Sequence, residues 1–166
     1  MTEQKIDKEA GAALDLLQDL IARARRAGAD AADAVFFEGV SLSHARRLGK
    51  TEKLERSEGH DLGLRVFIGR QQAVVSSTDR SQEALAELVE RAVAMARAVP
   101  EDPYCGIAEP GQLATRFPDL DTLDATEPAT EVLVARAKAA EEAALAVTGV
   151  TNSEGAEASW QTVCWS

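Results

Sequence analysis

The sequence predicts an α+β fold, a two-layer sandwich in which helices pack on an antiparallel, hairpin-rich sheet. Residues 59–79, GHDLGLRVFIGRQQAVVSSTD, are typical of two strands joined by a short turn at Gly69 and Arg70. Helical patterns on both sides of this hairpin, over residues 8–27 and 79–99, can cover one face of the sheet. No G-x-G-x-x-G or other phosphate-binding loop is present, and a hairpin does not build a parallel doubly wound sheet.

The first helix is predicted over residues 8–27. Asp7 is a candidate N-cap, Arg25 and Arg26 lie in the last turn, and Gly28 follows as a stop signal. Its apolar face is predicted to consist of Ala10, Ala13, Leu14, Leu17, Ile21 and Ala24.

Two stretches between this helix and the hairpin are predicted to be strands. Residues 34–47 alternate, but the parity changes between Phe37 and Val40, and Gly39 at that point predicts a β-bulge. Residues 50–59, KTEKLERSEG, form a polar strand suited to a sheet edge or an open face. The hairpin face that the helices must cover consists of Leu62, Leu64, Val66 and Ile68.

Two more helices are predicted, over residues 79–99 and 128–147. Asp79 is a candidate N-cap with Gln82 three residues later, as in a capping box, and Pro100 ends the helix. The apolar stripe of the earlier helix is predicted as Leu85, Leu88, Val89, Ala92, Met95, Ala96 and Val99. That of the later one is predicted as Leu133, Ala137, Ala140, Ala144 and Val147. A further strand is expected after Gly149.

Residues 100–128 contain all 5 prolines and are predicted to be a long irregular segment. A segment of this length is either functional or an arm that lies across another surface. Leu113, Phe117, Leu120 and Leu123 are expected to anchor it. The length of 166 residues favours a single domain over 1–166 that contains this segment.

Composition argues against several partners. The net charge of -10 disfavours direct nucleic-acid binding, and the short basic runs at 23–26 and 45–47 are expected to be solvated. There is no signal peptide and no apolar stretch near the ~18 residues that span a bilayer, so a cytoplasmic protein without membrane contact is expected. Cys105 and Cys164 are expected to be free thiols, because no metal or redox spacing is present.

No group of residues forms a recognisable catalytic motif. The only histidines are His44 and His60, and a metal site built on them needs further ligands such as Glu38 or Glu58. Strand-surface histidines are the simpler interpretation. Ser76 and Ser77 precede a helix, where serine commonly caps, and no histidine is identified that activates Cys105. Glu141 and Glu142 are expected on a solvated helix face. No catalytic, cofactor-binding or metal-binding residue is therefore predicted, which leaves an interaction module or one part of a larger enzyme.

The stretch from Leu54 to Pro110 resembles the N-terminal domain of the TldD/PmbA family. PmbA is also called TldE, and proteins of this family are often labelled modulator of DNA gyrase. The resemblance is carried by SEGHDLGLRV, by AVVSSTD after the short turn, and by the PEDPY run after the helix, and it extends over about 14–158. PEDPY and the GVTNSEGAEAS ending favour the TldE/PmbA type.

The resemblance implies a subunit of a heterodimeric TldD/TldE metalloprotease that processes peptides, with a TldD-like partner and extended peptide substrates. In TldD an H-E-x-x-x-H motif supplies zinc ligands, and no residue here matches it. The family therefore implies a chain that is non-catalytic by itself, with zinc held only by the partner, and self-association is the other expectation.

The ending WQTVCWS departs from the family, whose members continue into a larger, mostly β C-terminal domain that is absent here. A truncated gene, a shifted reading frame or an artificial boundary each explains this ending, and the last strand is expected to be unpaired with exposed tryptophans. The alternatives to a protease subunit are a stand-alone interaction module or regulator linked to DNA gyrase inhibitors, and a gene remnant.

Overall fold

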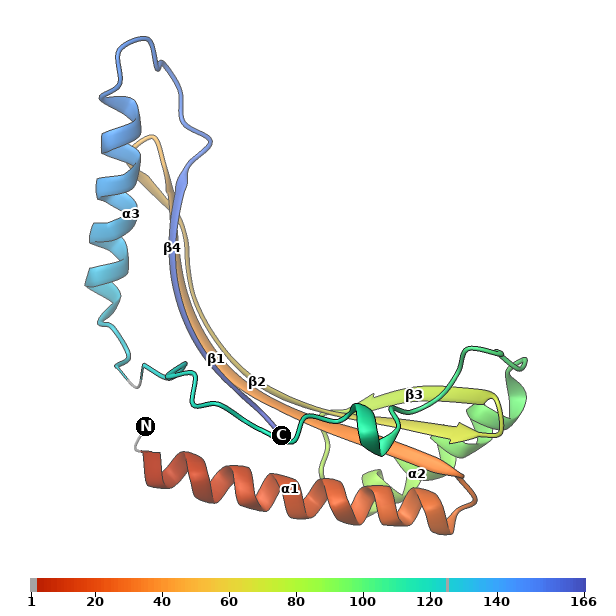
Figure 1. The fold of residues 1–166 in the computed structure, drawn as a ribbon. Coiled ribbons are helices and arrows are strands. Elements are labelled where there is room, and N and C mark those ends of the chain that lie inside the picture. The colour runs from red at the N-terminus through yellow and green to blue at the C-terminus, as the bar shows by residue number, and fades with distance from the viewer. Residues whose placement is uncertain (1–2, 125) are drawn as a thin grey trace. The chain divides into compact units, whose positions relative to one another are not determined.

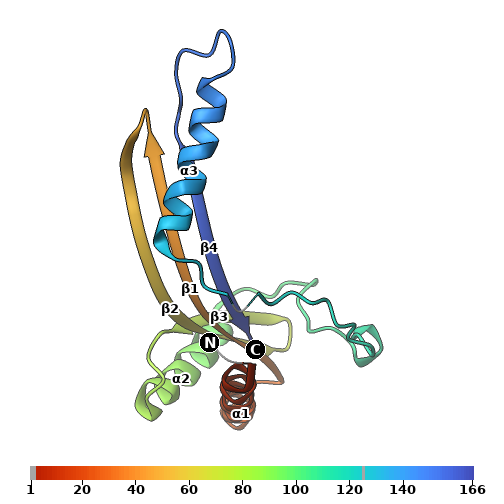
Figure 2. The same ribbon diagram turned by 90° about the vertical axis from the view of Figure 1, so that its left-hand side faces the viewer.

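The fold was analysed in a computed structural model that describes residues 3–124 and 126–166, with side chains from residue 11 onward. Its elements are α1 (Glu3–Arg26), β1 (Ala31–Arg47), β2 (Lys50–Ile68), β3 (Gln71–Ser77), α2 (Gln82–Ala98), the 3₁₀ turn η1 (Pro110–Gln112), α3 (Thr130–Leu145) and β4 (Ala156–Trp165). The four strands form one sheet in the order β3-β2-β1-β4, so that β1 lies between β2 and β4 (Figures 1 and 2). The α+β class with an antiparallel sheet is confirmed.

The chain divides into two compact units, because β1 and β2 are long enough to contribute to both. The first unit comprises Met1–Phe37, His60–Thr122 and Cys164–Ser166. The second comprises Glu38–Gly59 and Leu123–Val163.

In the first unit, α1 and α2 lie on the same face of the sheet (Figure 1). The predicted inner face of the hairpin is confirmed, because Leu62, Leu64 and Val66 have no exposed surface and join a single core cluster with both helices. β2 pairs with β3 in antiparallel register, with Leu64 opposite Val75. The turn at Gly69 and Arg70 is also confirmed, and Gly69 has a φ of 56°, which glycine adopts without steric cost.

The buried face of α1 is rotated about the helix axis relative to the predicted apolar face. Leu20 is buried and was not predicted, whereas Leu14 is 49% exposed. The buried positions Ala13, Leu17, Leu20 and Ala24 repeat at three and four, so they form an equally regular stripe. Asp7 is within the helix rather than at its N-cap, because α1 begins at Glu3. The side chain of Ala10 lies outside the described residues.

Helix α2 begins later than predicted. Its N-cap is Ser81, whose Oγ accepts a hydrogen bond of 3.3 Å from the Ala84 N–H. Asp79 instead accepts a hydrogen bond of 2.8 Å from the Ser81 N–H, so the predicted capping box at Asp79 and Gln82 is wrong. The buried stripe includes Val93 in place of the predicted Met95, which is 44% exposed.

In the second unit, α3 contributes one narrow buried stripe at i, i+4 and i+8: Leu133, Ala137 and Glu141. The predicted continuation through Ala140, Ala144 and Val147 is wrong, since these three side chains are exposed. From β1, the same unit buries Leu42 and His44.

The predicted change of parity at Gly39 is wrong as well. Ala32 and Phe36 before Gly39, and Leu42 and His44 after it, are all buried and all even-numbered. Val35 and Phe37, which suggested the change, lie on the less buried side of the strand because neither belongs to the core.

The predicted polar strand over 50–59 is the first half of β2, which continues without a break into the hairpin. All of its residues from Lys50 to Gly59 are exposed. Because β3 pairs only with Leu62–Ile68, this half also lies at an edge of the sheet within the described part of the chain, as predicted.

The segment over 100–128 is irregular apart from η1, as predicted, but its predicted anchors are wrong. Leu113, Phe117, Leu120 and Leu123 are all exposed, with Phe117 at 85%. The segment is instead attached at its start, where the Asp102 N–H donates to the Arg70 carbonyl over 2.8 Å.

The last strand is paired, contrary to the prediction. β4 lies beside β1, and Ser166 and Phe36 exchange two main-chain hydrogen bonds of 3.0 Å. The ring of Trp165 meets Phe37 edge-on at 4.8 Å, although Trp165 remains 68% exposed. Trp160 is half-buried.

Candidate functional site

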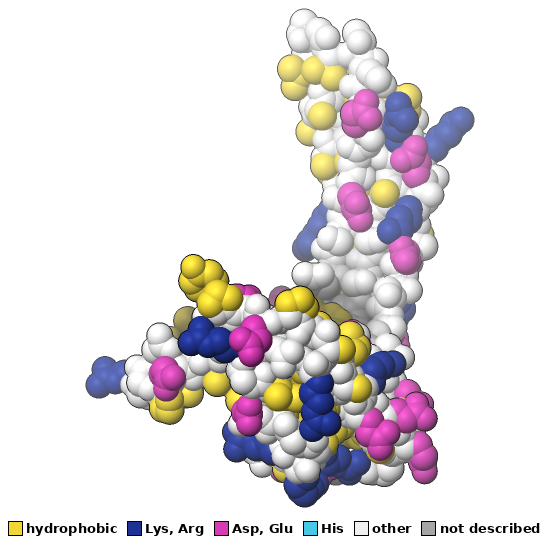
Figure 3. Space-filling model, turned by 90° about the vertical axis from the view of Figure 1, so that its right-hand side faces the viewer, with side chains coloured by type: hydrophobic (Ala, Val, Ile, Leu, Met, Phe, Trp, Pro, Cys, Tyr) yellow, Lys and Arg dark blue, Asp and Glu magenta, His cyan; other side chains and the backbone are white. Residues whose placement is uncertain are grey.

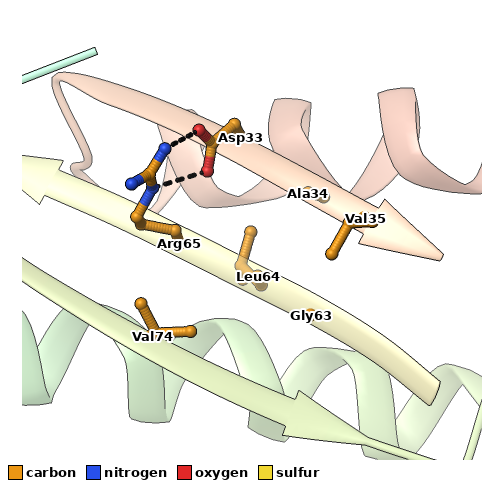
Figure 4. Close-up of a pocket in the computed structure, with 7 residues that line it drawn as sticks. All are labelled: Asp33, Ala34, Val35, Gly63, Leu64, Arg65 and Val74. Atoms are coloured by element: carbon orange, nitrogen blue, oxygen red, sulfur yellow. Dashed lines mark hydrogen bonds and ion pairs between the residues drawn. The ribbon is translucent and has the colours of Figure 1, made fainter. Parts of the chain in front are cut away.

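The first unit has a hollow of about 400 Å³ on the sheet face that α1 and α2 do not cover (Figure 4). Three neighbouring strands line it, and in the close-up the helices lie behind them. The lining residues are Asp33, Ala34 and Val35 of β1, Gly63, Leu64 and Arg65 of β2, and Val74 of β3. Strand alternation explains most of this set: Asp33, Val35, Gly63 and Arg65 are odd-numbered residues of β1 and β2 that point away from the core, and Val74 is an exposed residue of β3.

An ion pair forms the polar end of the hollow. The Arg65 guanidinium donates to both carboxylate oxygens of Asp33, one bond being 2.9 Å from Nε to Oδ1. These hydrogen bonds are the main cause that raises the pKa of Arg65, and the nearby Cys105 adds a smaller effect of the same sign. Arg65 also lies 5.1 Å from the centre of the Phe67 ring, a cation–π contact that orients it further.

The apolar part of the hollow exists because β2 has a glycine at its floor. A Cβ at Gly63 would lie 3.1 Å from Cγ1 of Val35, so any larger residue displaces Val35 or fills the space. Val35 and Val74 are 42% and 63% exposed, which leaves two aliphatic side chains facing solvent across this floor. An aliphatic surface beside a fixed ion pair is suited to binding a side chain of a peptide.

No serine, cysteine or histidine is among the residues that line the hollow. Within residues 3–124 and 126–166, no three His, Cys, Asp or Glu side chains are grouped so that they could hold a metal ion.

The two histidines have separate roles. His44 is buried in the second unit, with Nε2 3.2 Å from the Thr51 hydroxyl, and its Nδ1 has no partner among the described residues. The prediction that it lies on a strand surface is wrong. His60, in the first unit, contacts the Thr78 carbonyl through Nε2 at 2.9 Å.

The other candidate nucleophiles have structural roles or none. The Ser77 hydroxyl accepts a hydrogen bond of 3.0 Å from the Asp79 N–H, which shapes the approach to α2. Cys105 and Cys164 are free thiols, as predicted, and both are partly buried.

The principal polar group that sequence analysis missed is Glu141, a carboxylate that is 2% exposed in the second unit. It accepts hydrogen bonds from Arg46 Nε (3.0 Å), from the Leu48 N–H (2.6 Å) and from the Gly49 N–H (3.0 Å). The bond from Gly49 is the largest cause that lowers its pKa, with smaller contributions from Leu48 and Arg46, and they outweigh the effect of burial. Glu141 thus holds the β1–β2 turn against α3, and Arg46 is not the solvated residue that its basic run predicted.

Charges of both signs are intermixed over the surface shown in Figure 3. The basic run at 23–26 is placed at the end of α1, where Arg23 binds Asp19 over 2.6 Å, as the interpretation of a solvated helix end expects. No described helix is long and apolar enough to cross a membrane.

Comparison with a family model and comparison with individual proteins both identify the same family. Residues 32–96 match the model of PmbA/TldA metallopeptidase domain 1. The chain is 34% identical to Metalloprotease PmbA of Escherichia coli O157:H7 over 127 residues, which is 76% of this chain and 28% of that protein. It is 35% identical to a Metalloprotease PmbA homolog of Haemophilus influenzae over 135 residues, 80% of this chain and 30% of that protein. The chain thus spans less than a third of the length of these relatives.

Solved structures with the same fold come from the same group of proteins. A putative modulator of DNA gyrase from Bacteroides thetaiotaomicron matches with a TM-score of 0.72 at 16% identity, over 91% of this chain and 40% of that one. TldE from Thermococcus kodakarensis matches with a TM-score of 0.64 at 17% identity, over 91% of this chain and 35% of that one. The hollow, Gly63 and the ion pair all fall within the residues that the family model covers. The chain is a member of the PmbA/TldD family and carries the N-terminal domain of that family.

Proposed function

We propose that this chain acts as the N-terminal domain of a PmbA/TldE-type subunit of a metalloprotease, and that it binds the peptide substrate without cleaving it. The observation that carries the proposal is the 34–35% identity to PmbA metalloproteases over three quarters or more of the chain. Zinc, in this proposal, is held by a TldD-like partner, where it activates the water that hydrolyses the peptide bond.

The hollow supports a role in holding an extended peptide. β3 is the terminal strand of the sheet, so its outer edge can pair with a peptide main chain regardless of sequence. Val74 lies on this strand and lines the hollow, so one apolar side chain of such a peptide can enter the space between Val74 and Val35. The fixed Arg65–Asp33 pair then limits how far that side chain extends.

The subunit role is tested by combining the purified chain with a TldD-type subunit. Cleavage of an unfolded reporter peptide is expected only when both are present, and removal of zinc with a chelator is expected to abolish it. Hydrolysis of the peptide by this chain alone, with or without chelator, would contradict the proposal.

The peptide-binding role predicts that filling the hollow weakens binding. Gly63→Val occupies the space in front of Val35, and the affinity for a fluorescent unfolded peptide is expected to fall roughly tenfold, as for a side chain excluded from an apolar pocket. Fluorescence anisotropy measures this affinity.

Two further variants make this test specific. Gly59→Val is the matched control, because a Cβ at Gly59 meets nothing within 4 Å and Gly59 lies outside the hollow. Val74→Asp adds a charge to the hollow at an exposed position, so it should weaken binding without affecting the core. Equal affinity in all four proteins would show that the peptide does not use the hollow.

A second candidate function is a stand-alone interaction module or regulator linked to DNA gyrase inhibitors. The Bacteroides relative is named a putative modulator of DNA gyrase. The exposed apolar side chains of the segment over 100–128 favour it, since Tyr104 and Phe117 are 94% and 85% exposed. A pull-down that returns one stable partner other than a TldD-like protein, and loses it with Phe117→Ser, would favour this function.

A further inference from the structure

The first half of β2 has an open side that can accept another strand. Within the described part of the chain, β3 pairs with β2 only from Leu62 to Ile68, and β1 lies on the other side. The stretch from Lys50 to Glu58 therefore has main-chain groups that no strand covers, and its side chains are exposed.

The two ends of β2 show how its main-chain groups are directed. Leu48 and Gly49 have φ values of 47° and 82°, as in the type I′ turn of a two-residue hairpin loop. Such a loop closes on a hydrogen-bonded pair, here Arg47 with Lys50, so the N–H and C=O groups of Lys50 face β1. At the other end of β2 the Phe67 carbonyl accepts from the Asp30 N–H, so odd-numbered groups face β1 there and the alternation reverses once along the strand.

The sequence of this edge is complementary to itself in the antiparallel direction. The segment KTEKLERSE runs from Lys50 to Glu58 with Leu54 at its centre. When two copies are placed with Leu54 opposite Leu54, every charged residue meets a residue of opposite charge. The pairs are Lys53 with Glu55, Glu52 with Arg56, Lys50 with Glu58, and the uncharged Thr51 with Ser57.

Neighbouring registers lose this complementarity. Moving one copy by one residue places Lys53 opposite Arg56, or Glu52 opposite Glu55 when it moves the other way. A shift by two residues places Glu52 opposite Glu58 or Lys50 opposite Arg56. Like charges directly opposite each other destabilise a strand pair, so a single register is favoured.

The favoured register also agrees with the main-chain pattern. It pairs odd-numbered residues with odd-numbered ones and even-numbered with even-numbered ones, so the outward-facing main-chain groups of one copy meet those of the other. The two copies of Leu54 then lie directly opposite each other on one face of the joined sheet. Leu54 is 56% exposed in the single chain, so the pairing covers the one apolar side chain of this edge.

Contacts within the chain hold the charged side chains in place. Lys53 lies 2.5 Å from Glu55, and Arg56 lies 2.9 Å from Glu58. Arg56 also binds Glu127. A carboxylate can accept from two cations, so these pairs extend into a network when a second strand brings its own charges.

We propose that the Lys50–Glu58 edge of β2 binds the same edge of a second copy of this chain, forming a symmetric dimer about a twofold axis that passes between the two Leu54 residues. The sheet then continues from one copy into the other. The interaction is isologous, so each ion pair occurs twice, and it weakens as salt screens the exposed charges.

Sedimentation equilibrium of the full chain tests the proposal. The wild-type protein is expected to form a reversible dimer that dissociates as salt is added. Lys53→Glu places carboxylates opposite each other in both symmetric pairs, and Glu55→Lys places ammonium groups there. Each substitution alone is expected to weaken the dimer at least tenfold.

The decisive step is to mix the two variants. A chain with Lys53→Glu and a chain with Glu55→Lys are complementary to each other, so the mixture is expected to form a heterodimer that neither variant forms alone. The double variant with both substitutions restores self-complementarity and is expected to dimerise like the wild type. Lys138→Glu, on α3 beside Glu142, is the charge-matched control and should leave the dimer unchanged.

Circular dichroism shows whether each variant is folded, and none of these positions is in the core. A wild-type chain that stays monomeric at every concentration overturns the proposal. A dimer that both single substitutions leave intact overturns it as well, as does a mixture that gains no association over its components.

Discussion

Glu141→Gln is expected to lower the melting temperature of the second unit on the order of 10 °C. Glutamine offers one acceptor oxygen where the carboxylate offers two, so it cannot receive Arg46, Leu48 and Gly49 together. Its amide group then faces another donor in a buried site, and a buried donor without a partner is costly. Thermal unfolding followed by circular dichroism measures the effect.

The adjacent residue supplies a matched control. Glu142 is exposed, and its ion pair with Lys138, 3.7 Å long, is exposed as well. Exposed ion pairs contribute little to stability, so Glu142→Gln is expected to leave the melting temperature nearly unchanged. Hydrogen exchange distinguishes the two variants locally, since only Glu141→Gln should speed exchange of the Leu48 and Gly49 amides. Equal effects of the two substitutions would show that Glu141 does not hold the turn.

The lowered pKa of Glu141 also predicts an acid-dependent loss of stability. A carboxylate whose pKa is below its ordinary value of 4.5 in the folded state stabilises the fold above that value, and the contribution disappears as the pH falls through the folded pKa. The wild type should therefore lose its advantage over Glu141→Gln as the pH falls below 4.5. Asp79 and Asp124 also have lowered pKa values but titrate in both proteins, so their effects cancel in the difference. A difference that stays constant down to the acid transition would contradict this assignment.

Leu20→Ala is expected to destabilise the first unit by about 2–5 kcal/mol, the usual cost of removing a leucine side chain from a close-packed core. Leu20 is 1% exposed and belongs to the core cluster formed by α1, α2 and the hairpin. Urea unfolding monitored by circular dichroism gives the change in the free energy of unfolding.

The same helix offers the comparison. Leu14 is 49% exposed, so Leu14→Ala is expected to cost less than about 1 kcal/mol, helped by the higher helix propensity of alanine. The sequence pattern predicted the opposite ranking of these two leucines. A larger loss from Leu14→Ala than from Leu20→Ala would mean that α1 packs with another face.

The hairpin and the α2 stripe could be predicted because their signals are local. Leu62, Leu64 and Val66 alternate strictly, and Gly69 permits the turn, so register and facing follow from a few residues. Two apolar stripes compete on α1, and the choice between Leu14 and Leu20 depends on what packs against the helix.

Glu141 could not be predicted for a related reason. In an acidic chain a glutamate on a helix is normally solvated, and its partners Arg46, Leu48 and Gly49 are more than 90 residues away in the sequence. The one local signal was that Glu141 continues the i, i+4 spacing of Leu133 and Ala137 on α3. A pattern of apolar residues does not indicate that a charged side chain on the same stripe is buried.

The candidate site also depends on contacts between residues that are distant in the sequence. No residue of the hollow carries a catalytic motif, and the hollow forms only where Gly63, Val35 and Val74 from three strands meet. The Asp33–Arg65 pair joins residues 32 positions apart, so it required the pairing of β1 with β2.

By itself, the sequence determined the α+β class, the hairpin, the polar character of residues 50–59 and, through its resemblance, the family. These properties follow from local periodicity and from short sequence motifs, which need no knowledge of long-range contacts. The tertiary structure decided which stripe of α1 is buried, which glutamate holds the β1–β2 turn, and that β3 stops short of covering the charged edge of β2. Each of these outcomes depends on which surfaces meet, because burial is a property of pairs of elements and not of one element alone.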